Sequence, residues 1–307
     1  MQAQNVIPEF ALIENLSPHW RERFEKALEY LFDRLDQIPP PSWDEVASHC
    51  AISPQHFHRM FHSVFNEPPG QYLRRLRLQE AVHLLMSNDS GSITDVAFAT
   101  GFSSSQALAK ALRRDLGTNA KSIRKMGNDP KLEGLSELLG RLGHPDVADA
   151  ENRDSLEVKM AKQLTFDICS YPERRVSGRL FKTPSWEQLA AVGERQVSNE
   201  LVMLTQVEHL DRATLNDFEM IVGEWSESSV SNVGVTTLAA GEYLTCTASL
   251  DSELAYFAVW DEFDRYLLLH DLDVPAESYT VEIAHDSSTM MNDVSVMTFQ
   301  MLVTPVV

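Results

Sequence analysis

Four polar side chains are spaced so that they share one face of a helix predicted to begin at Ser53-Pro54. They lie at relative positions i, i+3, i+4 and i+7, and are Gln55, His58, Arg59 and His62. Arginine can hold O6 and N7 of guanine through two hydrogen bonds, and glutamine can hold N6 and N7 of adenine in the same way. The pattern therefore predicts contacts to base edges from Gln55, His58 and Arg59, with His62 nearer the nucleic-acid backbone.

The same two histidines, His58 and His62, are four residues apart, which is a spacing found in metal-binding helices. The zinc-hydrolase pattern has a glutamate directly after the first histidine, and Arg59 occupies that position in this sequence. We therefore expect no metal at this helix, and the sequence indicates no cofactor.

A second group of polar side chains follows Ser103 in the same way. Three of them, Ser105, Gln106 and Lys110, are predicted to face bases, and Arg113 is predicted to contact DNA beside them. Phosphate groups are bound by helix N-termini and by arginine, which predicts phosphate-positioning roles for Ser53, Arg75 and Ser103. The alternative for each of these side chains is a solvated helix face without a ligand.

These two groups belong to two copies of one sequence pattern. The first copy contains residues 44–47, residues 50–53 and then Phe57, Phe61 and Phe65; the second contains residues 94–97, residues 100–103 and then Leu108, Leu112 and Leu116. Val46 corresponds to Val96 at a shift of 50 residues, whereas Phe57 corresponds to Leu108 at a shift of 51. Each copy is typical of a helix-turn-helix unit, and a pair of units can reach neighbouring stretches of the DNA major groove.

Serine residues mark the predicted starts of these helices. Ser42 with Glu45 has the spacing of a capping box, Ser92 is the corresponding cap in the second copy, and Ser103 is the predicted cap of the second recognition helix. Gly117 is predicted to end that helix. A long helix over residues 71–86 is predicted to join the two units and to fix their separation.

Charge is distributed unevenly along the chain. The net charge is −19, yet residues 43–126 contain ten basic and seven acidic residues, and the first 126 residues are neutral in sum. Residues 127–307 therefore carry the whole excess of acid. This asymmetry predicts two domains with different partners, of which the acidic one is not expected to contact DNA.

Length and composition are those of an ordinary protein with about two domains. The chain has 307 residues and three scattered cysteines, Cys50, Cys169 and Cys246, which suggest neither a zinc site nor a disulfide framework. Residues 1–15 lack a basic-then-apolar signal pattern, and no apolar run is long enough to span a bilayer. We therefore expect a cytoplasmic protein without a membrane partner.

The C-terminal part has a different pattern. Two segments are predicted as helices, from residue 186 to about 197 and over residues 253–270. Six segments are predicted as strands: 164–170, 175–181, 218–225, 242–248, 279–284 and 294–303. The predicted organisation is multidomain, with an all-α double helix-turn-helix domain at 1–126, a linker at 127–155, and an α+β domain with an antiparallel sheet at 156–307.

Residues 20–125 resemble the DNA-binding domain of AraC-type transcription regulators. The resemblance rests on residues 43–47, 52–57, 59–61, 71–78, 93–97 and 101–104, and on residues 110–114 with Gly117. Where the family usually has Phe, Pro and an aromatic residue, this chain has Leu108 and Leu112, Ala120, and Ile123. These differences favour unequal units, in which the first supplies most of the sequence discrimination.

Residues 156–307 resemble the gyrase-inhibitor-like effector-binding domain of Rob-like regulators. The residues that carry this are 171–176, Gly223, 238–243, the helix bearing Trp260, 281–283 and 303–306. In relatives that bind drugs, a glutamate matching Glu282 lies in an aromatic-lined cleft. The resemblance implies an effector site formed by Glu282 with aromatic side chains, for which the candidates are Trp186, Trp225, Tyr243 and Trp260, and such a site would suit a cationic aromatic molecule.

The leading interpretation is a sequence-specific DNA-binding transcription regulator that a small, cationic and aromatic effector modulates. Its partners would be double-stranded DNA, the effector and RNA polymerase, with the oligomeric state left open. One alternative is a regulator whose C-terminal domain has a vestigial pocket and serves only protein–protein contact. A more distant alternative is a hydrolase activity in that domain, but no Gly-x-Ser-x-Gly motif or catalytic Cys/His pairing is present, so we expect no enzyme.

Overall fold

A computed structural model describes residues 2–87, 91–129, 134–146, 154–184, 186–193, 199–210, 214, 216–226, 234–289 and 294–306, without the side chains of residues 136, 186, 187 and 289. The chain forms two compact units. One contains Pro8–Lys159, and the other combines Met1–Ile7 with Met160–Val307. Residues 127–159, most of which the sequence suggested as a linker, thus lie in the helical unit, and the first seven residues lie in the other.

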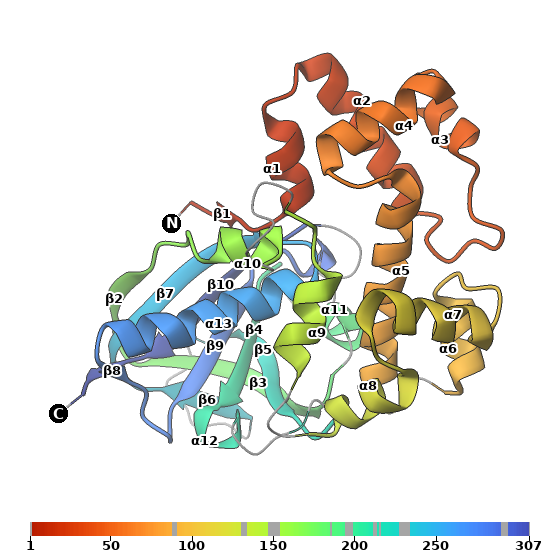
Figure 1. The fold of residues 1–307 in the computed structure, drawn as a ribbon. Helices are drawn as coiled ribbons and strands as arrows, with labels where there is room; N and C mark the ends of the chain where they lie inside the picture. Colours follow the sequence, from red (N-terminus) through yellow and green to blue (C-terminus); the bar gives the residue numbers. More distant parts are fainter. Residues whose placement is uncertain are drawn as a thin grey trace. The chain divides into compact units, whose positions relative to one another are not determined.

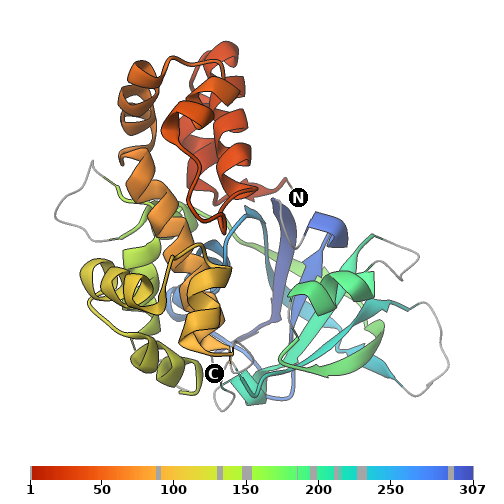
Figure 2. The same ribbon diagram turned by 90° about the vertical axis from the view of Figure 1, so that its right-hand side faces the viewer.

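The unit of residues 8–159 is helical. Two helix pairs, α3 (Trp43–His49) with α4 (Pro54–Phe65) and α6 (Ile93–Ala99) with α7 (Ser105–Ala111), are the two predicted units, and α5 (Pro69–Met86) runs between them (Figures 1 and 2). The remaining elements are α1 (Pro8–Glu14), α2 (Pro18–Phe32), a π-helical turn η1 (Leu112–Leu116), α8 (Ala120–Gly127), α9 (Leu135–Leu142) and α10 (Leu156–Ala161), which crosses into the other unit.

Aromatic residues at helical spacing form the core around the first pair. Phe57, Phe61 and Phe65 of α4 are fully buried and pack against Phe24 of α2 and Tyr72 of α5. Such ring pairs contribute about 0.5–1.5 kcal/mol each beyond the burial of their area. Because the phenylalanine face of α4 packs into this core, the opposite face of the helix points to solvent.

The turns of the two units have the same backbone geometry. Ser42 and Ser92 each form a complete capping box, with Glu45 and Asp95, at the start of α3 and α6. Both turns then contain one residue with positive φ, Ala51 at 54° and Gly101 at 75°. The amide N–H of the residue after it donates 2.8 Å back to the first helix in both units. The duplication seen in the sequence is therefore a duplication of structure.

The predicted cap of the second recognition helix is wrong by one residue. Ser104, not Ser103, precedes α7, and its Oγ accepts a hydrogen bond from the Ala107 N–H at 3.2 Å. The second turn is one residue longer than the first, so the cap Ser53 corresponds to Ser104 at a shift of 51. From this point α4 and the combined segment of α7 and η1 correspond residue by residue.

Replacing Ser104 with alanine should therefore lower the free energy of unfolding by about 1 kcal/mol, because the first turn of α7 loses its side-chain acceptor. Ser103→Ala is the matched control and should change stability by less than about 0.5 kcal/mol. Urea unfolding followed by circular dichroism distinguishes the two serines, and equal losses for both variants would contradict the assignment of the cap.

The other unit contains a nine-stranded sheet in the order β1-β7-β10-β9-β4-β5-β3-β6, with β2 also paired to β7. All pairs are antiparallel except β1 with β7. The strands are β1 (Gln4–Asn5), β2 (Asp167–Tyr171), β3 (Arg174–Lys182), β4 (Leu201–Gln206), β5 (Glu219–Trp225), β6 (Val235–Leu238), β7 (Gly241–Leu250), β9 (Tyr279–Ala284) and β10 (Ser295–Leu302). The sequence analysis missed β1, β4 and β6.

Short elements and one long helix complete this unit. Strands β8 (Leu272–Asp273) and β11 (Thr304–Pro305) form a separate two-stranded sheet, and the helical segments are α11 (Trp186–Gly193), α12 (Val207–Leu210), α13 (Glu253–Leu269) and the 3₁₀ turn η2 (Ser287–Thr289). Helix α13 lies along one face of the large sheet (Figure 1). Tyr256 and Trp260 of α13 pack there against Phe299 of β10. The chain thus combines a helical region with a domain rich in antiparallel sheet, as predicted.

Within the described residues, no helix is both long enough and apolar enough to cross a membrane.

Candidate DNA-binding surface and C-terminal pocket

The structure brings together all four side chains predicted on the first recognition helix. Gln55, His58, Arg59 and His62 are exposed on the face of α4 opposite its phenylalanines. Arg59 forms no hydrogen bond or ion pair with any residue that the structure describes. An exposed guanidinium without a partner among the described residues is available to bind a ligand.

The side chain of His58 packs against another aromatic residue. Its ring meets the Trp43 indole edge-on, with ring centres 5.9 Å apart. A shallow groove beside it is lined by His58, Arg59, His62, Ser63 and Pro68. Across the described part of the chain, no cluster of histidine, cysteine and carboxylate side chains is suited to a metal ion.

The second recognition helix presents a corresponding face. Gln106, Lys110 and Arg113 are exposed, and Ser105 is half-buried. At the shift of 51 residues, these three exposed positions match Gln55, Arg59 and His62 of α4, so an amide is repeated by an amide and a cation by a cation. The combined segment of α7 and η1, which is as long as α4, therefore repeats the amide and the cation at two of these positions and has Arg113 where α4 has His62.

Arg75 does not belong to the DNA-binding surface, which corrects the predicted phosphate contact. Its side chain is only 10% exposed, and its Nε and Nη2 atoms donate to Oε1 of Glu67 at 2.9 and 2.8 Å. Glu9 lies 3.7 Å away on the other side. Burial raises the pKa of Glu67, and the charge of Arg75 opposes that rise. Arg75 is therefore an internal counter-ion.

Of the two serines predicted to position phosphates, neither side chain caps its helix. Ser53 is the N-terminal residue before α4, but its hydroxyl makes no capping bond, and it is exposed. Ser103 lies one residue before the true cap of α7 and is also exposed. Both hydroxyls therefore face solvent beside a helix N-terminus, and their phosphate contacts stay predictions.

The predicted effector residues are divided between the two faces of the sheet. Glu282 of β9 is buried under α13, where its Oε1 accepts a hydrogen bond from the Tyr256 hydroxyl at 2.8 Å. Burial raises the pKa of Glu282 to about 7, although hydrogen bonds from Tyr256 and Trp260 act in the opposite direction. Glu282 and Trp260 are therefore parts of the layer between sheet and helix.

Trp225 and Tyr243 lie on the opposite face. The neighbours of Glu282 in β9, Val281 and Ile283, pack in one cluster with both aromatic residues. Successive side chains of a strand point to opposite faces, so Glu282 cannot share this cluster. The expected site that combines Glu282 with Trp225 and Tyr243 is thus wrong. The side chain of Trp186 lies outside the described part of the chain.

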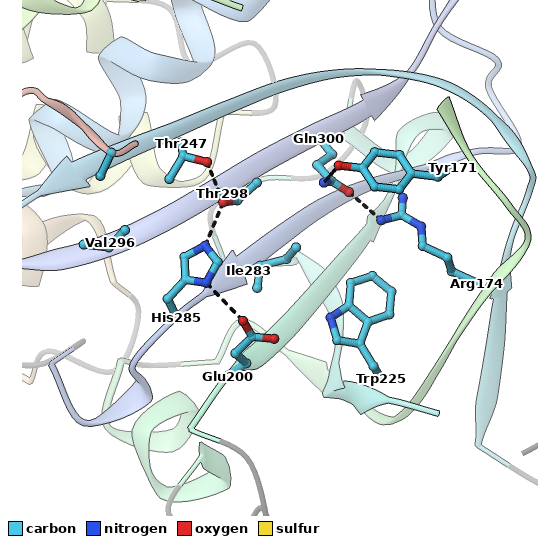
Figure 3. A pocket seen from close by; sticks show the side chains of 11 residues that line it. Tyr171, Arg174, Glu200, Trp225, Thr247, Ile283, His285, Val296, Thr298 and Gln300 are labelled. Carbon is cyan, nitrogen blue, oxygen red and sulfur yellow. Dashed lines mark hydrogen bonds and ion pairs between the residues drawn. The ribbon is translucent and has the colours of Figure 1, made fainter. Parts of the chain in front are cut away.

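The face that carries Trp225 contains a pocket that the sequence analysis did not predict (Figure 3). Its lining comes from six strands and from residues next to them: Ala3, Tyr171, Arg174, Glu200, Trp225, Thr247, Ile283, His285, Val296, Thr298 and Gln300. Trp225 is the single predicted effector residue among them. Strand alternation could have placed Gln300 and Thr298 on one face, but the sequence did not show which strands are neighbours.

Two hydrogen-bonded groups lie in this pocket, as Figure 3 shows. In the first, Gln300 accepts from Arg174 at 2.9 Å and donates to the Tyr171 hydroxyl at 3.1 Å. In the second, the ring of His285 lies between Glu200, 3.1 Å from Nδ1, and the Thr298 hydroxyl, 2.8 Å from Nε2. The pocket therefore has two chemically different ends.

Comparison with known proteins gives the class of the helical region. A family described as a helix-turn-helix domain matches residues 46–126. The transcriptional activator RhaS of Escherichia coli O139:H28 (strain E24377A) is 33% identical over 134 residues, which cover 43% of this chain and 46% of RhaS. The chain thus spans less than half the length of that curated relative.

Solved structures with similar parts are more distant. A regulator with an AraC-type DNA-binding domain from Chromobacterium violaceum is 24% identical, with a TM-score of 0.32 over 36% of this chain and 96% of that one. The EcmrR–DNA complex in EcmrR-RPo is 11% identical, with a TM-score of 0.38 over 81% of this chain and 99% of that one. Within residues 46–126, the family match and the two observed units define a helix-turn-helix domain.

Proposed function

We propose that this protein is a sequence-specific transcription regulator that binds double-stranded DNA through both helix-turn-helix units. The observation that carries the proposal is the repeated exposed face: the amide Gln55 and the cation Arg59 recur as Gln106 and Lys110, and the exposed His62 is matched by the exposed Arg113. A single solvated helix face needs no ligand, but its repetition at equivalent positions of two units suits two successive contacts with the same polymer.

The connection between the units supports this proposal. Arg77 of α5 is buried and donates to the carbonyl oxygens of Leu35 at 2.7 Å and Gly101 at 2.6 Å. A third bond joins it to Gln37 at 2.9 Å. One side chain thus ties the turn of the second unit to the loop after α2, and rigid spacing suits a DNA repeat of about 34 Å per turn.

The two units differ in ways that favour unequal roles. The first offers Arg59, which can hold a guanine through two bonds, whereas the equivalent Lys110 is a point charge that suits phosphate. Helix α4 is α-helical throughout, but its counterpart changes to a π-helical turn at Leu112. We infer that the first unit supplies most of the sequence discrimination and the second mainly positions the protein.

Arg59→Ala should weaken binding to the preferred DNA site by about 1–3 kcal/mol and relax the preference for one base pair. The selected site is first obtained from a random DNA pool, and affinities are then measured by gel retardation at a fixed, stated salt concentration. Arg113→Ala should instead weaken binding to all sequences to a similar extent, because a phosphate contact carries no sequence information.

Lys26→Ala provides the control, since it removes one exposed positive charge from α2, outside both recognition helices. It should leave both the affinity and the selected sequence unchanged. If Arg59→Ala behaves like Lys26→Ala, Arg59 does not contact a base. If the wild-type chain selects no sequence from the pool, the proposed function itself is wrong.

The C-terminal unit is proposed to bind a small effector in the pocket on the Trp225 face of the sheet. This assignment differs from the site predicted around Glu282, because the pocket and Glu282 lie on opposite faces. The pocket has polar groups at both ends and the apolar Ile283 and Trp225 between them, which is the usual composition of a small-molecule site (Figure 3).

A further inference from the structure

The guanidinium of Arg174 lies in the pocket without an acidic partner among the described residues. Its Nη1 donates to Gln300, but Nε and Nη2 are shielded from water and have no hydrogen-bond partner. Three aromatic rings surround it instead, with Cζ 4.0 Å from the ring centre of Tyr171, 4.7 Å from that of Tyr243 and 5.1 Å from that of Trp225. The charge is therefore held by ring faces and one neutral amide.

This arrangement is costly for the isolated protein. Arg174 is half-buried as a whole, but a shielded N–H without an acceptor has a cost of about 1–3 kcal/mol. Cation–π contacts with the surrounding rings offset only part of this free-energy cost. Two other arginines with little exposure are better compensated: Arg75 has Glu67, and Arg77 has three carbonyl oxygens. Arg174 differs from both, because its only hydrogen-bond acceptor among the described residues is the amide oxygen of Gln300.

The groups around Arg174 present donors to the pocket. Because Gln300 uses its amide N–H₂ to donate to the Tyr171 oxygen, the hydroxyl proton of Tyr171 stays free for another acceptor. The amide oxygen of Gln300 already accepts from Arg174. This end of the pocket therefore combines one positive charge with an unused O–H donor, which is the chemistry that binds a carboxylate.

The one carboxylate in the lining belongs to the opposite group. Glu200 pairs with Nδ1 of His285 and is 42% exposed, so solvent and the imidazole both reduce its field. Between the two groups the wall is formed by Ile283 and by the indole of Trp225 (Figure 3). A flat apolar body would fill this space while an acidic group faces Arg174.

We propose that the pocket binds small aromatic carboxylates, with the carboxylate held by Arg174 and Tyr171 and the ring against Trp225. This inference deepens the proposed effector function and rests on it only for the regulatory consequence. The proposed ligand is an anion, whereas a site formed around Glu282 was expected to bind a cation. Since Nε and Nη2 are closed to water, direct contact requires a neighbouring ring to move, and Trp225 is the ring that lies farthest from Cζ.

Three probes with one ring system test the charge preference. Titration calorimetry on the full chain compares 2-naphthoate, neutral 2-naphthamide and the cation 2-naphthylmethylammonium. The expected result is that naphthoate binds at least tenfold more tightly than naphthamide, and that the cation binds most weakly. Equal or tighter binding of the cation, or no binding of naphthoate at millimolar concentration, overturns the proposal.

Variants locate the preference at Arg174. Arg174→Gln should bind naphthoate and naphthamide with equal affinity, whereas Arg179→Gln, an exposed change in the same strand, should keep the wild-type ratio. Should Arg174→Gln fail to fold, Tyr171→Phe removes only the free donor and should reduce the ratio severalfold. An unchanged ratio in folded Arg174→Gln, or in Tyr171→Phe where the first variant does not fold, rejects the site.

The regulatory part is tested separately. Ligand titrations are done without DNA, and selection of a DNA site is done without ligand, so failure of either leaves the other result standing. A final gel-retardation series adds naphthoate to the selected DNA complex. The expected change in DNA affinity is at least threefold in the wild type and absent in Arg174→Gln; no change in the wild type removes the effector role while leaving the carboxylate site.

Discussion

Replacing Arg75 with methionine is expected to lower the free energy of unfolding by about 3–5 kcal/mol, because it removes one partner of a buried ion pair and leaves the other. Glu67 would keep its burial but lose both N–H donors, and Glu9 would lose its nearby positive charge. Arg113→Met is the control, since that arginine is exposed and should change stability by less than about 0.5 kcal/mol.

The loss of stability in Arg75→Met should shrink as the pH falls from 7 to 5. Burial raises the pKa of Glu67 and of Glu157, and in both cases the charge of Arg75 limits the rise. Without Arg75 both pKa values rise further in the folded state. An acid with a raised folded-state pKa contributes its full stability below the unfolded-state pKa, and this contribution is lost as the pH increases. The difference in free energy of unfolding between wild type and Arg75→Met is therefore largest at neutral pH.

His144 acts in the same direction, because loss of the Arg75 charge lets the pKa of His144 rise in the variant and so lowers the cost of charging its ring at low pH. In the wild type the ring of His144 lies 3.9 Å from Glu67, and burial together with the charge of Arg75 lowers its pKa to about 4, so the wild-type ring is neutral over this range. Urea unfolding of wild type and variant at pH 5, 6 and 7 measures the effect. A difference in free energy that is the same at all three pH values would falsify the role of Glu67 and Glu157 as acids coupled to Arg75.

The sequence predicted the helical unit well because its signals are local. The spacing of Phe57, Phe61 and Phe65 determines which face of α4 is buried, and hence which face is exposed. Ser103 was predicted as the cap because the second copy was aligned with the first at the shift of 50 residues, which holds before the additional residue of the second turn. The shift of 51 between Phe57 and Leu108 instead makes Ser104 equivalent to the cap Ser53. Arg75 was different, because nothing in its own segment shows that Glu9 lies beside it.

The C-terminal site could not be predicted because it depends on strand order. Alternation along β9 separates Glu282 from Val281 and Ile283, but it does not say which face lies under α13 and which carries the pocket. That choice follows from pairing between β9 and β10, which brings Glu282 opposite Phe299 under the helix. Arg174 and Gln300 are 126 positions apart, so no local pattern joins them.

The turns of the two units allow a matched test of the structural duplication. Gly101 and Ala51 occupy equivalent positions with φ of 75° and 54°, a conformation that costs residues with a side chain about 1–2 kcal/mol. Gly101 is also closely surrounded: a Cβ atom there would lie 2.5 Å from the Leu35 oxygen and 2.6 Å from Cζ of Arg77. Glycine is required in the second unit and merely preferred in the first.

Gly101→Ala should therefore destabilise the protein by about 2–5 kcal/mol, from backbone strain together with displacement of the Arg77 guanidinium. Ala51→Gly should have the opposite sign and raise stability by up to about 1 kcal/mol, because it relieves the same strain at an exposed position. Because Arg77 holds the turn of the second unit to α5 and to the loop after α2, Gly101→Ala should also weaken binding to the selected DNA site more than Ser104→Ala does. Urea unfolding and gel retardation of the three variants measure these effects; a loss at Gly101 no larger than the cost of positive φ alone would mean that displacement of the Arg77 guanidinium adds no cost.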